Sequence, residues 1–304
     1  MIKRLIALII IFLGLYYIYD NNLFSSRQLV RDIRKEIYLP ATNEYVKKDV
    51  KNSFVKNTND FVPDNKQELL DIYYTVVNNG WDSFTFYCNY DKCIEDVNEI
   101  STNGVLLSNI NSFVSTYNQY DTISTYTTPL LNAKVNIVIK RTYDDYMIKK
   151  TNEQIDAIYK ELDLDNKDID IEEQIKTVHD YIINNSKYDD LKIDNIEDNT
   201  YFSNTAYGPL FQGYAVCSGY TDAMALFLDK MNIPNIKVAS ATHIWNLVYL
   251  NDEWYHLDLT WDDPYTEDST NIISHNFFLI DYEKLKAWNT EEHIFDQNIY
   301  REAL

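Results

Sequence analysis

The chain has 304 residues and a formal net charge of −20, from 47 acidic and 27 basic side chains. This charge argues against nucleic-acid binding, because no basic surface could offset the repulsion between the protein and a phosphate backbone. Apolar residues make up 45% of the chain, which is enough for a folded core in one large domain or two small ones.

The first segment begins with Lys3 and Arg4 and continues as an apolar run over residues 5–18. A basic start and a short apolar core are typical of a secretory signal, but bulky residues follow in place of a small-x-small cleavage site. The run approaches the lower length limit of a membrane helix, and the basic pair would stay inside. We interpret residues 1–20 as a signal anchor, or else as a cleaved signal peptide. A buried amphipathic helix fits less well, because the run is apolar all round.

Residues 21–150 predict an N-terminal region of helices and strands, with a small α+β domain over about residues 43–141. Val135, Ile137 and Ile139 alternate with other residues and so fall on one face of a strand. No motif in this region indicates chemistry, and we expect it to position substrate or to act as a spacer from the membrane. The expected elements are helices at residues 26–37 and 65–79 and strands at 83–88 and 133–143.

Three cysteines are present, and two of them, Cys88 and Cys93, bracket a turn-like stretch. These two are close enough for a local disulfide if the turn allows it. The export signal favours this disulfide over the alternative of two unpaired thiols in a cytosolic protein. A single C-x4-C pair without a nearby histidine does not indicate a metal site, so we expect neither a metal nor a cofactor. Cys217 is left as a free thiol.

Helices are expected at residues 144–162 and 169–185, followed by a helix that begins near Cys217. From residue 220 onward, apolar side chains recur at helical spacing until Asn232 and Pro234 stop the helix. Free N–H groups and the positive dipole end at such a position favour a thiolate and could hold an oxyanion. Taken alone, Cys217 is better interpreted as a buried structural cysteine.

A β-hairpin is predicted after this helix. Asn251 and Asp252 form its turn, so that Leu250 pairs with Glu253. Counting back, His243 then lies diagonally across from Asp258 on the same face, within reach of a side-chain contact. A register slip of one residue would put the two on opposite faces. The expected strands cover residues 236–241, 243–250 and 254–260.

A thiol, an imidazole and a carboxylate in this order are the parts of a nucleophilic triad. The thiolate attacks an acyl carbon, the imidazole carries the proton, and the carboxylate orients the imidazole. Each residue alone has a simpler reading: a buried cysteine, a hydrogen-bonded strand histidine, a carboxylate that binds a turn. Together they favour Cys217, His243 and Asp258 as catalytic residues.

The remaining histidines carry no such pattern. We interpret His179 and His256 as packed structural residues, and His275 and His293 have no local context. Gln212, shortly before Cys217, is interpreted as a solvent-facing loop residue.

The motifs around the three candidate residues resemble the core of the transglutaminase-like superfamily in its bacterial form. Cys217 lies in G-Y-A-V-C-S-G-Y, His243 in T-H-I-W-N and Asp258 in W-Y-H-L-D-L-T-W-D-D-P, with no departure at these positions. Residues 175–189 and 206–210 also fit, so the resemblance covers roughly the last third to 45% of the chain.

The resemblance implies an α+β, papain-like fold in which the nucleophile helix packs on an antiparallel sheet, with a catalytic domain over residues 151–304. It implies acyl transfer through a cysteine, but relatives include crosslinking transglutaminases, peptidases, amidases and members without activity. We expect an extracytoplasmic, membrane-anchored or secreted peptidase or amidase acting on peptide or glutamine amide bonds of a cell-wall or surface substrate. The alternatives are a protein-crosslinking transglutaminase and a surface peptide-binding module without catalysis.

Overall fold

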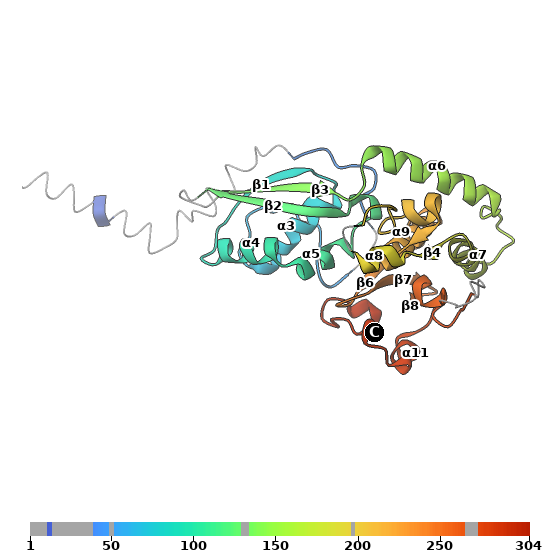
Figure 1. The fold of residues 1–304 in the computed structure, drawn as a ribbon. Coiled ribbons are helices and arrows are strands. Elements are labelled where there is room, and N and C mark those ends of the chain that lie inside the picture. Colours follow the sequence, from blue (N-terminus) through green and yellow to red (C-terminus); the bar gives the residue numbers. More distant parts are fainter. Residues whose placement is uncertain (1–10, 14–38, 49–51, 129–133, 196–197, 265–272) are drawn as a thin grey trace, which may run out of the picture.

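The computed structural model describes residues 11–13, 39–48, 52–128, 134–195, 198–264 and 273–304 (Figure 1). The expected signal segment, apart from residues 11–13, and the expected helix at 26–37 lie outside these residues. Among the described residues, no helix combines the length and apolar character needed to cross a membrane.

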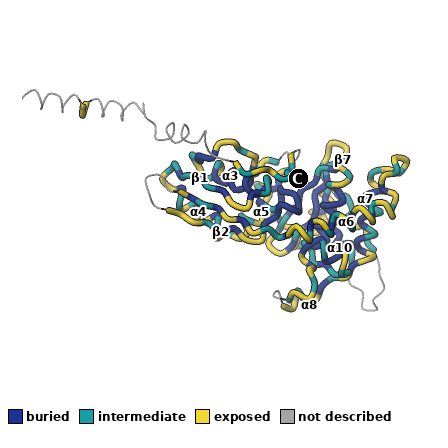
Figure 2. Tube along the Cα trace, turned by 90° about the horizontal axis from the view of Figure 1, so that it is seen from above, coloured by how far each residue is buried: buried dark blue, intermediate teal, exposed yellow. Residues whose placement is uncertain are grey.

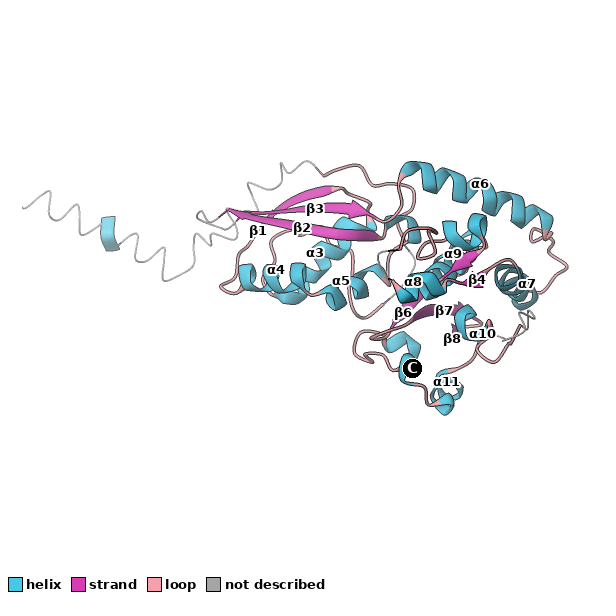
Figure 3. Ribbon diagram, viewed as in Figure 1, coloured by secondary structure: helices cyan, strands magenta, loops and turns pink. Residues whose placement is uncertain are grey.

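The N-terminal part is a three-stranded antiparallel sheet in the order β1-β3-β2. Its helices α3, α4 and α5 lie along one face of the sheet (Figure 3). The predicted alternation in β3 is confirmed: Val135, Ile137 and Ile139 are buried, whereas Val138 faces outward. The strands are β1 (Ser83–Tyr87), β2 (Tyr120–Thr128) and β3 (Lys134–Arg141), and the helices are α3 (Lys66–Asn78), α4 (Cys93–Thr102) and α5 (Gly104–Asn111), followed by the short η2 (Thr116–Asn118).

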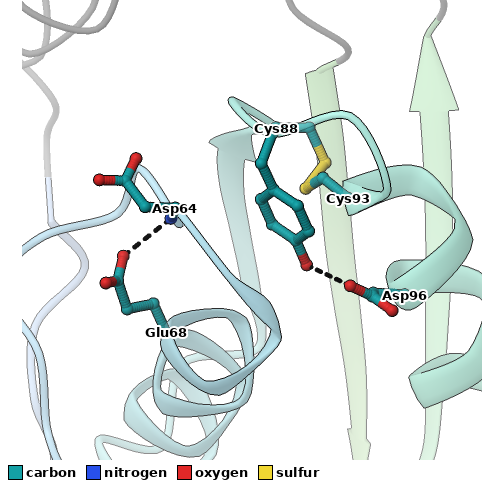
Figure 4. Close-up of a disulfide and its surroundings, with 6 residues drawn as sticks. Asp64, Glu68, Cys88, Cys93 and Asp96 are labelled. Carbon is teal, nitrogen blue, oxygen red and sulfur yellow. Dashed lines mark hydrogen bonds between the residues drawn. A yellow bond between two sulfur atoms is a disulfide. The ribbon is translucent and has the colours of Figure 1, made fainter.

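Helices α4 and α5 and strand β2 were not among the elements that the sequence predicts. A disulfide joins Cys88 to Cys93, the first residue of α4, with the two Cα atoms 5.5 Å apart (Figure 4). Within the bracketed turn, the hydroxyl of Tyr90 donates a hydrogen bond to Asp96 over 2.6 Å. The expected pairing of these two cysteines is therefore present, and Cys217 is free.

Two helices lead from this sheet into the second half, close to their predicted bounds. Each begins at an aspartate whose side chain caps a backbone N–H: Asp144 binds Met147, and Asp170 binds Glu172. The elements here are α6 (Asp145–Glu161), α7 (Ile171–Asn184), β4 (Lys187–Tyr188), α8 (Asp190–Asp194), the π-helical η3 (Gly208–Gln212) and β5 (Tyr214–Ala215).

The second half is built on an antiparallel sheet of order β6-β7-β8, buried on both faces. Val248 and Leu250 pack with helix α9, while Trp245 and Leu247 on the opposite face pack with the C-terminal segment and the N-terminal sheet. Figure 1 shows α9 and α11 on opposite sides of this sheet. These elements are α9 (Cys217–Lys230), β6 (Asn235–Ala239), β7 (Ile244–Leu250), β8 (Glu253–Leu257), α10 (Leu259–Asp262), α11 (Tyr282–Trp288), η4 (Glu291–His293) and η5 (Arg301–Ala303). The chain is thus α+β, with the nucleophile helix on an antiparallel sheet.

The hydrophobic core runs without interruption from the N-terminal sheet into the second half. Phe86 and Ile137 of the first sheet belong to the same buried cluster as Val238 and Leu247 of the second. Figure 2 shows the buried segments, in dark blue, continuing through both parts of the molecule. The division of the chain near residue 150 stays a prediction.

The predicted hairpin register is confirmed, since Leu250 pairs with Glu253. Asn251 and Asp252 both have positive φ angles, of 51° and 68°, which suits a tight hairpin turn and which Asn and Asp tolerate without glycine. The predicted bounds of the return strand were wrong, however, because β8 ends at Leu257 and the chain then enters α10.

Candidate active site

Cys217 is the first residue of α9 and is partly exposed. Two glycines shape the approach to it. Gly213 adopts a positive φ of 73°, and Gly219 lies so close to a neighbouring segment that a Cβ would stand 2.1 Å from the carbonyl oxygen of Ser203. The spacing of glycine, cysteine and glycine therefore lets the chain turn sharply into the helix and lets a loop pack against its first turn.

Tyr188 stands next to the cysteine and was missed by the sequence analysis. Its strand β4 pairs with β5 so that Tyr188 is opposite Ala215, two residues before Cys217. Burial raises the pKa of the Tyr188 phenol to about 12, the charge of Cys217 adds to this, and a hydrogen bond with the backbone of Cys217 acts against it. A neutral hydroxyl is therefore held beside the first N–H group of the helix. The sequence does not reveal this position, because Tyr188 reaches Cys217 only through the pairing of β4 with β5, each two residues long.

His243 lies at the end of the tight turn between β6 and β7. Its backbone carbonyl accepts from Ser240 N at 2.8 Å, and its own N–H donates to Ser240 Oγ at 3.0 Å. The ring is buried and stacks on Trp245, with 5.6 Å between ring centroids. The imidazole is thereby fixed both through its backbone and through its ring face.

His243 Nε2 lies 2.5 Å from Asp258 Oδ2, the contact that the hairpin register predicts. Asp258 follows β8 directly and is the N-cap of α10. Its other oxygen, Oδ1, accepts from the backbone N–H groups of Thr260 at 3.0 Å and Trp261 at 3.3 Å. One carboxylate therefore both caps a helix and binds the imidazole.

Electrostatics favour a charged pair at this point. Burial by itself lowers the pKa of His243, but the Asp258 carboxylate and the Cys217 thiol offset this and raise the pKa to about 10. Burial would raise the pKa of Asp258, yet His243 and then His293 hold it at about 2. At neutral pH the histidine is thus protonated and the aspartate ionised.

His293 is the second residue at this site that sequence reasoning missed. It lies in η4 of the C-terminal segment, and its Nε2 is 2.9 Å from Asp258 Oδ2, the same oxygen that His243 contacts. Nothing in the local sequence around His293 marks it, because the contact spans 35 residues of chain.

His256 is a packed structural histidine, as predicted. Its Nδ1 accepts from Trp245 Nε1 at 2.9 Å, and Nε2 donates to the carbonyl of Ala303 at 3.0 Å. Burial lowers its pKa to about 4. The prediction for Gln212 was wrong: it belongs to the π-helix η3 and accepts from Phe202 N at 2.7 Å, so its carbonyl is committed to holding that loop.

A second cluster of histidines and carboxylates joins α7 to α10 through hydrogen bonds. His179 lies fully buried between two carboxylates, with Nδ1 2.8 Å from Asp180 and Nε2 3.2 Å from Asp262. His275 Nε2 also meets Asp180 at 2.7 Å, and the Lys176 ammonium binds the same carboxylate. Burial lowers the pKa of His179, but the two aspartates more than offset this and raise it.

Two groups of side chains in the described residues are compact enough to hold a metal ion. One is His179 with Asp180 and His275, and the other is His243 with Asp258 and His293. In both groups the ring nitrogens already hydrogen-bond the carboxylate, and these hydrogen bonds account for the geometry.

A cavity of about 690 Å³ lies beside the β6–β7 turn that carries His243. One wall comes from the end of β6 and the turn, at Ala239, Ser240 and Ala241, and the other from the end of α4 and from α5. Residues of the N-terminal part therefore face the turn that leads to His243 across this cavity.

Residues 158–259 match the family model of the transglutaminase-like superfamily. This stretch includes Cys217, His243 and Asp258, and it shows that the chain carries a transglutaminase-like core. No curated protein matches the chain.

Two solved structures are similar over part of their length. One, the "Crystal structure of a TGase", is 13% identical with a TM-score of 0.36, over 50% of this chain and 47% of the other. The second, a "Putative Cysteine Protease from Cytophaga hutchinsonii", is 13% identical with a TM-score of 0.28, over 45% and 62%. The chain thus covers less than two thirds of either protein, and likenesses of this size carry no argument about activity.

Proposed function

We propose that the protein is an extracytoplasmic cysteine peptidase or amidase that works by acyl transfer. The hydrogen bond between His243 and Asp258 supports this most directly, because it orients the imidazole and favours its protonated form. The same imidazole also interacts with the Cys217 thiol. Such an arrangement is what a cysteine nucleophile requires. Cys217, His243 and Asp258 are the proposed catalytic residues.

In the proposed reaction, the Cys217 thiolate attacks the carbonyl carbon of an amide, and the electron pair of the carbonyl moves onto its oxygen. The N–H groups at the start of α9 and the neutral Tyr188 hydroxyl stabilise this oxyanion. When the C–N bond breaks, His243 gives its proton to the leaving amine and a thioester remains. His243 then takes a proton from water, which attacks the thioester; the C–S bond breaks, the acid leaves, and the Cys217 thiolate and protonated His243 are restored.

Water is the acceptor that we propose, because most bacterial relatives with this short core lack the amine-directing features of dedicated crosslinkers. A crosslinking transglutaminase would use the same thioester with an amine in place of water. Whether water or an amine reacts depends on which of them can reach the thioester after the first amine has left.

Two features support a place outside the cytoplasm. The Cys88–Cys93 disulfide is of a kind that persists in oxidising compartments, and the basic and then apolar start of the chain is typical of an export signal. We propose that this segment also attaches the protein to the membrane, and that the substrate is a peptide or protein of the cell wall or surface.

The test is amide cleavage by the wild-type protein and by Cys217→Ala, using a mixture of fluorogenic peptides and glutamine amides. Hydroxylamine is added in parallel, because it traps a thioester as a hydroxamate. We expect cleavage and hydroxamate formation by the wild type only. Equal turnover by Cys217→Ala would overturn the proposal, and hydroxamate or amine incorporation without cleavage in water would favour the crosslinking reaction.

A further inference from the structure

We propose that His293 is a positioning residue for the catalytic aspartate, holding the Asp258 carboxylate in the orientation that serves His243. This inference rests on the proposed function, since it assigns a fourth member to the same site. It also gives the C-terminal segment, far from the nucleophile in sequence, a part in the catalytic centre.

The geometry of the carboxylate carries the inference. His243 and His293 both direct Nε2 to Asp258 Oδ2, at 2.5 Å and 2.9 Å. The backbone N–H groups of Thr260 and Trp261 occupy Oδ1. Each oxygen of the carboxylate thus accepts two hydrogen bonds. Rotation of the carboxylate would break bonds at both oxygens.

The hydrogen bonds of His293 define its tautomer. Thr290 Oγ1 lies 2.5 Å from Nδ1 of the ring, and a hydroxyl is able to donate there. Nε2 then carries a proton, which it donates to the Asp258 carboxylate. Both ring nitrogens are then satisfied, and Nε2 presents a donor to the carboxylate, which can only accept.

Aromatic rings lock His293 in place and keep water away from the carboxylate. His293 is 6% exposed. Its ring stacks on Phe277 with centroids 5.1 Å apart, and it meets Trp245 at 4.9 Å and Trp261 at 5.0 Å. Asp258 is 1% exposed, so water has little access to replace the bond that His293 donates.

The consequence for catalysis follows from the shared oxygen. Without the His293 donor, one lone pair of Asp258 Oδ2 is left unsatisfied in a dry site, and the carboxylate turns to find another donor. The imidazole of His243 then loses the partner that orients it, although His243 and Asp258 are both still present. His293 acts through Asp258 and touches neither the nucleophile nor the substrate.

The test compares His293→Leu with His293→Gln in the full-length protein. The Gln amide still offers an N–H toward Asp258, whereas Leu fills the space without a donor. The readouts are the rate of Cys217 alkylation by iodoacetamide at pH 7 and the melting temperature. We expect the alkylation rate to fall by about tenfold in His293→Leu, the size of one lost hydrogen bond to a charged group, and to recover largely in His293→Gln.

His256→Leu is the matched control, because His256 is also buried and doubly hydrogen-bonded but binds Trp245 and Ala303 instead of Asp258. We expect it to lower the melting temperature while the folded protein keeps its alkylation rate. If His293→Leu does not fold, Thr290→Val is the second variant. It removes the hydroxyl at His293 Nδ1, and it should lower the alkylation rate by weakening the preference for the tautomer protonated on Nε2. The inference is overturned if His293→Leu alkylates like the wild type while His243→Ala is slow. If His243→Ala is also as fast as the wild type, it is the proposed function that fails.

Discussion

His243 and Asp258 hydrogen-bond at 2.5 Å although neither lies within the paired part of the hairpin. His243 precedes β7 by one residue, and Asp258 follows β8 by one. The register of the strands brings the two residues to the same end and face, and the capping of α10 fixes the carboxylate there. The two residues thus lie just outside the paired strands, at the start of β7 and at the end of β8.

Asp258→Asn should lower turnover by roughly 10³- to 10⁴-fold, the size of the loss that this change causes in a Ser-His-Asp triad. The amide has a single oxygen, so it cannot accept both from the α10 backbone and from His243. Asp258→Ala should add a loss of about 1 kcal/mol in stability because the helix cap is gone. Steady-state kinetics and urea unfolding of the two variants separate these effects; full activity in Asp258→Asn would be incompatible with the proposed role.

The stability of the protein should depend on the protonation of His243. Its pKa is raised from 6.5 to about 10, so the protonated ring is favoured in the folded state. This contribution is fully present below pH 6.5 and is lost as the pH rises through about 10. The melting temperature of the wild type should therefore fall more steeply over this range than that of His243→Gln. Parallel curves for the two proteins would contradict the charged pair.

Gly219→Ala should destabilise the protein by about 2 kcal/mol, since the added Cβ would collide with the Ser203 carbonyl, which is backbone and cannot swing aside. Gly104→Ala is the matched control, because nothing lies within 4 Å of the corresponding Cβ in α5. That change should be neutral or stabilising by about 0.5 kcal/mol. Urea unfolding measures both, and an equal response of the two variants would show that the close approach to Ser203 is not needed.

Ala241→Trp should weaken peptide cleavage without slowing alkylation of Cys217 by iodoacetamide. Ala241 is exposed and lines the cavity beside the His243 turn, so a larger side chain would obstruct an extended substrate but not a small reagent. Ala287→Trp, on the exposed surface of α11, controls for the added ring. A rise in KM is expected for Ala241→Trp alone; unchanged cleavage by this variant would place the substrate elsewhere.

The sequence predicted those parts of the site that depend on local pattern. Helical spacing after Cys217 predicted that this residue begins a helix, and a two-residue turn was enough to define the register that joins His243 to Asp258. The strand after Trp254 was drawn too long, because apolar alternation continues past the point where the Asp258 side chain captures backbone N–H groups and starts a helix.

Other parts depend on contacts that no local pattern encodes. His293 reaches Asp258 only because the C-terminal segment folds back across the sheet, and Tyr188 reaches Cys217 through a pairing of two residues on each strand. Helices α4 and α5 were missed as well, since they are short and take their stability from packing on the first sheet rather than from strong intrinsic preference.

Alkylation of Cys217 by iodoacetamide at pH 6–8, in the wild type and in His243→Ala, tests the central claim most directly. An unassisted thiol is only a few per cent thiolate at neutral pH, so an imidazolium partner should make the wild type react about tenfold faster than the variant. This difference should be largest near pH 6 and should narrow toward pH 8, because a free thiol with a pKa of about 8.5 then ionises without help. Equal, slow reaction of both proteins would mean that Cys217 and His243 do not form a working pair, and a binding module without catalysis would then be the better description.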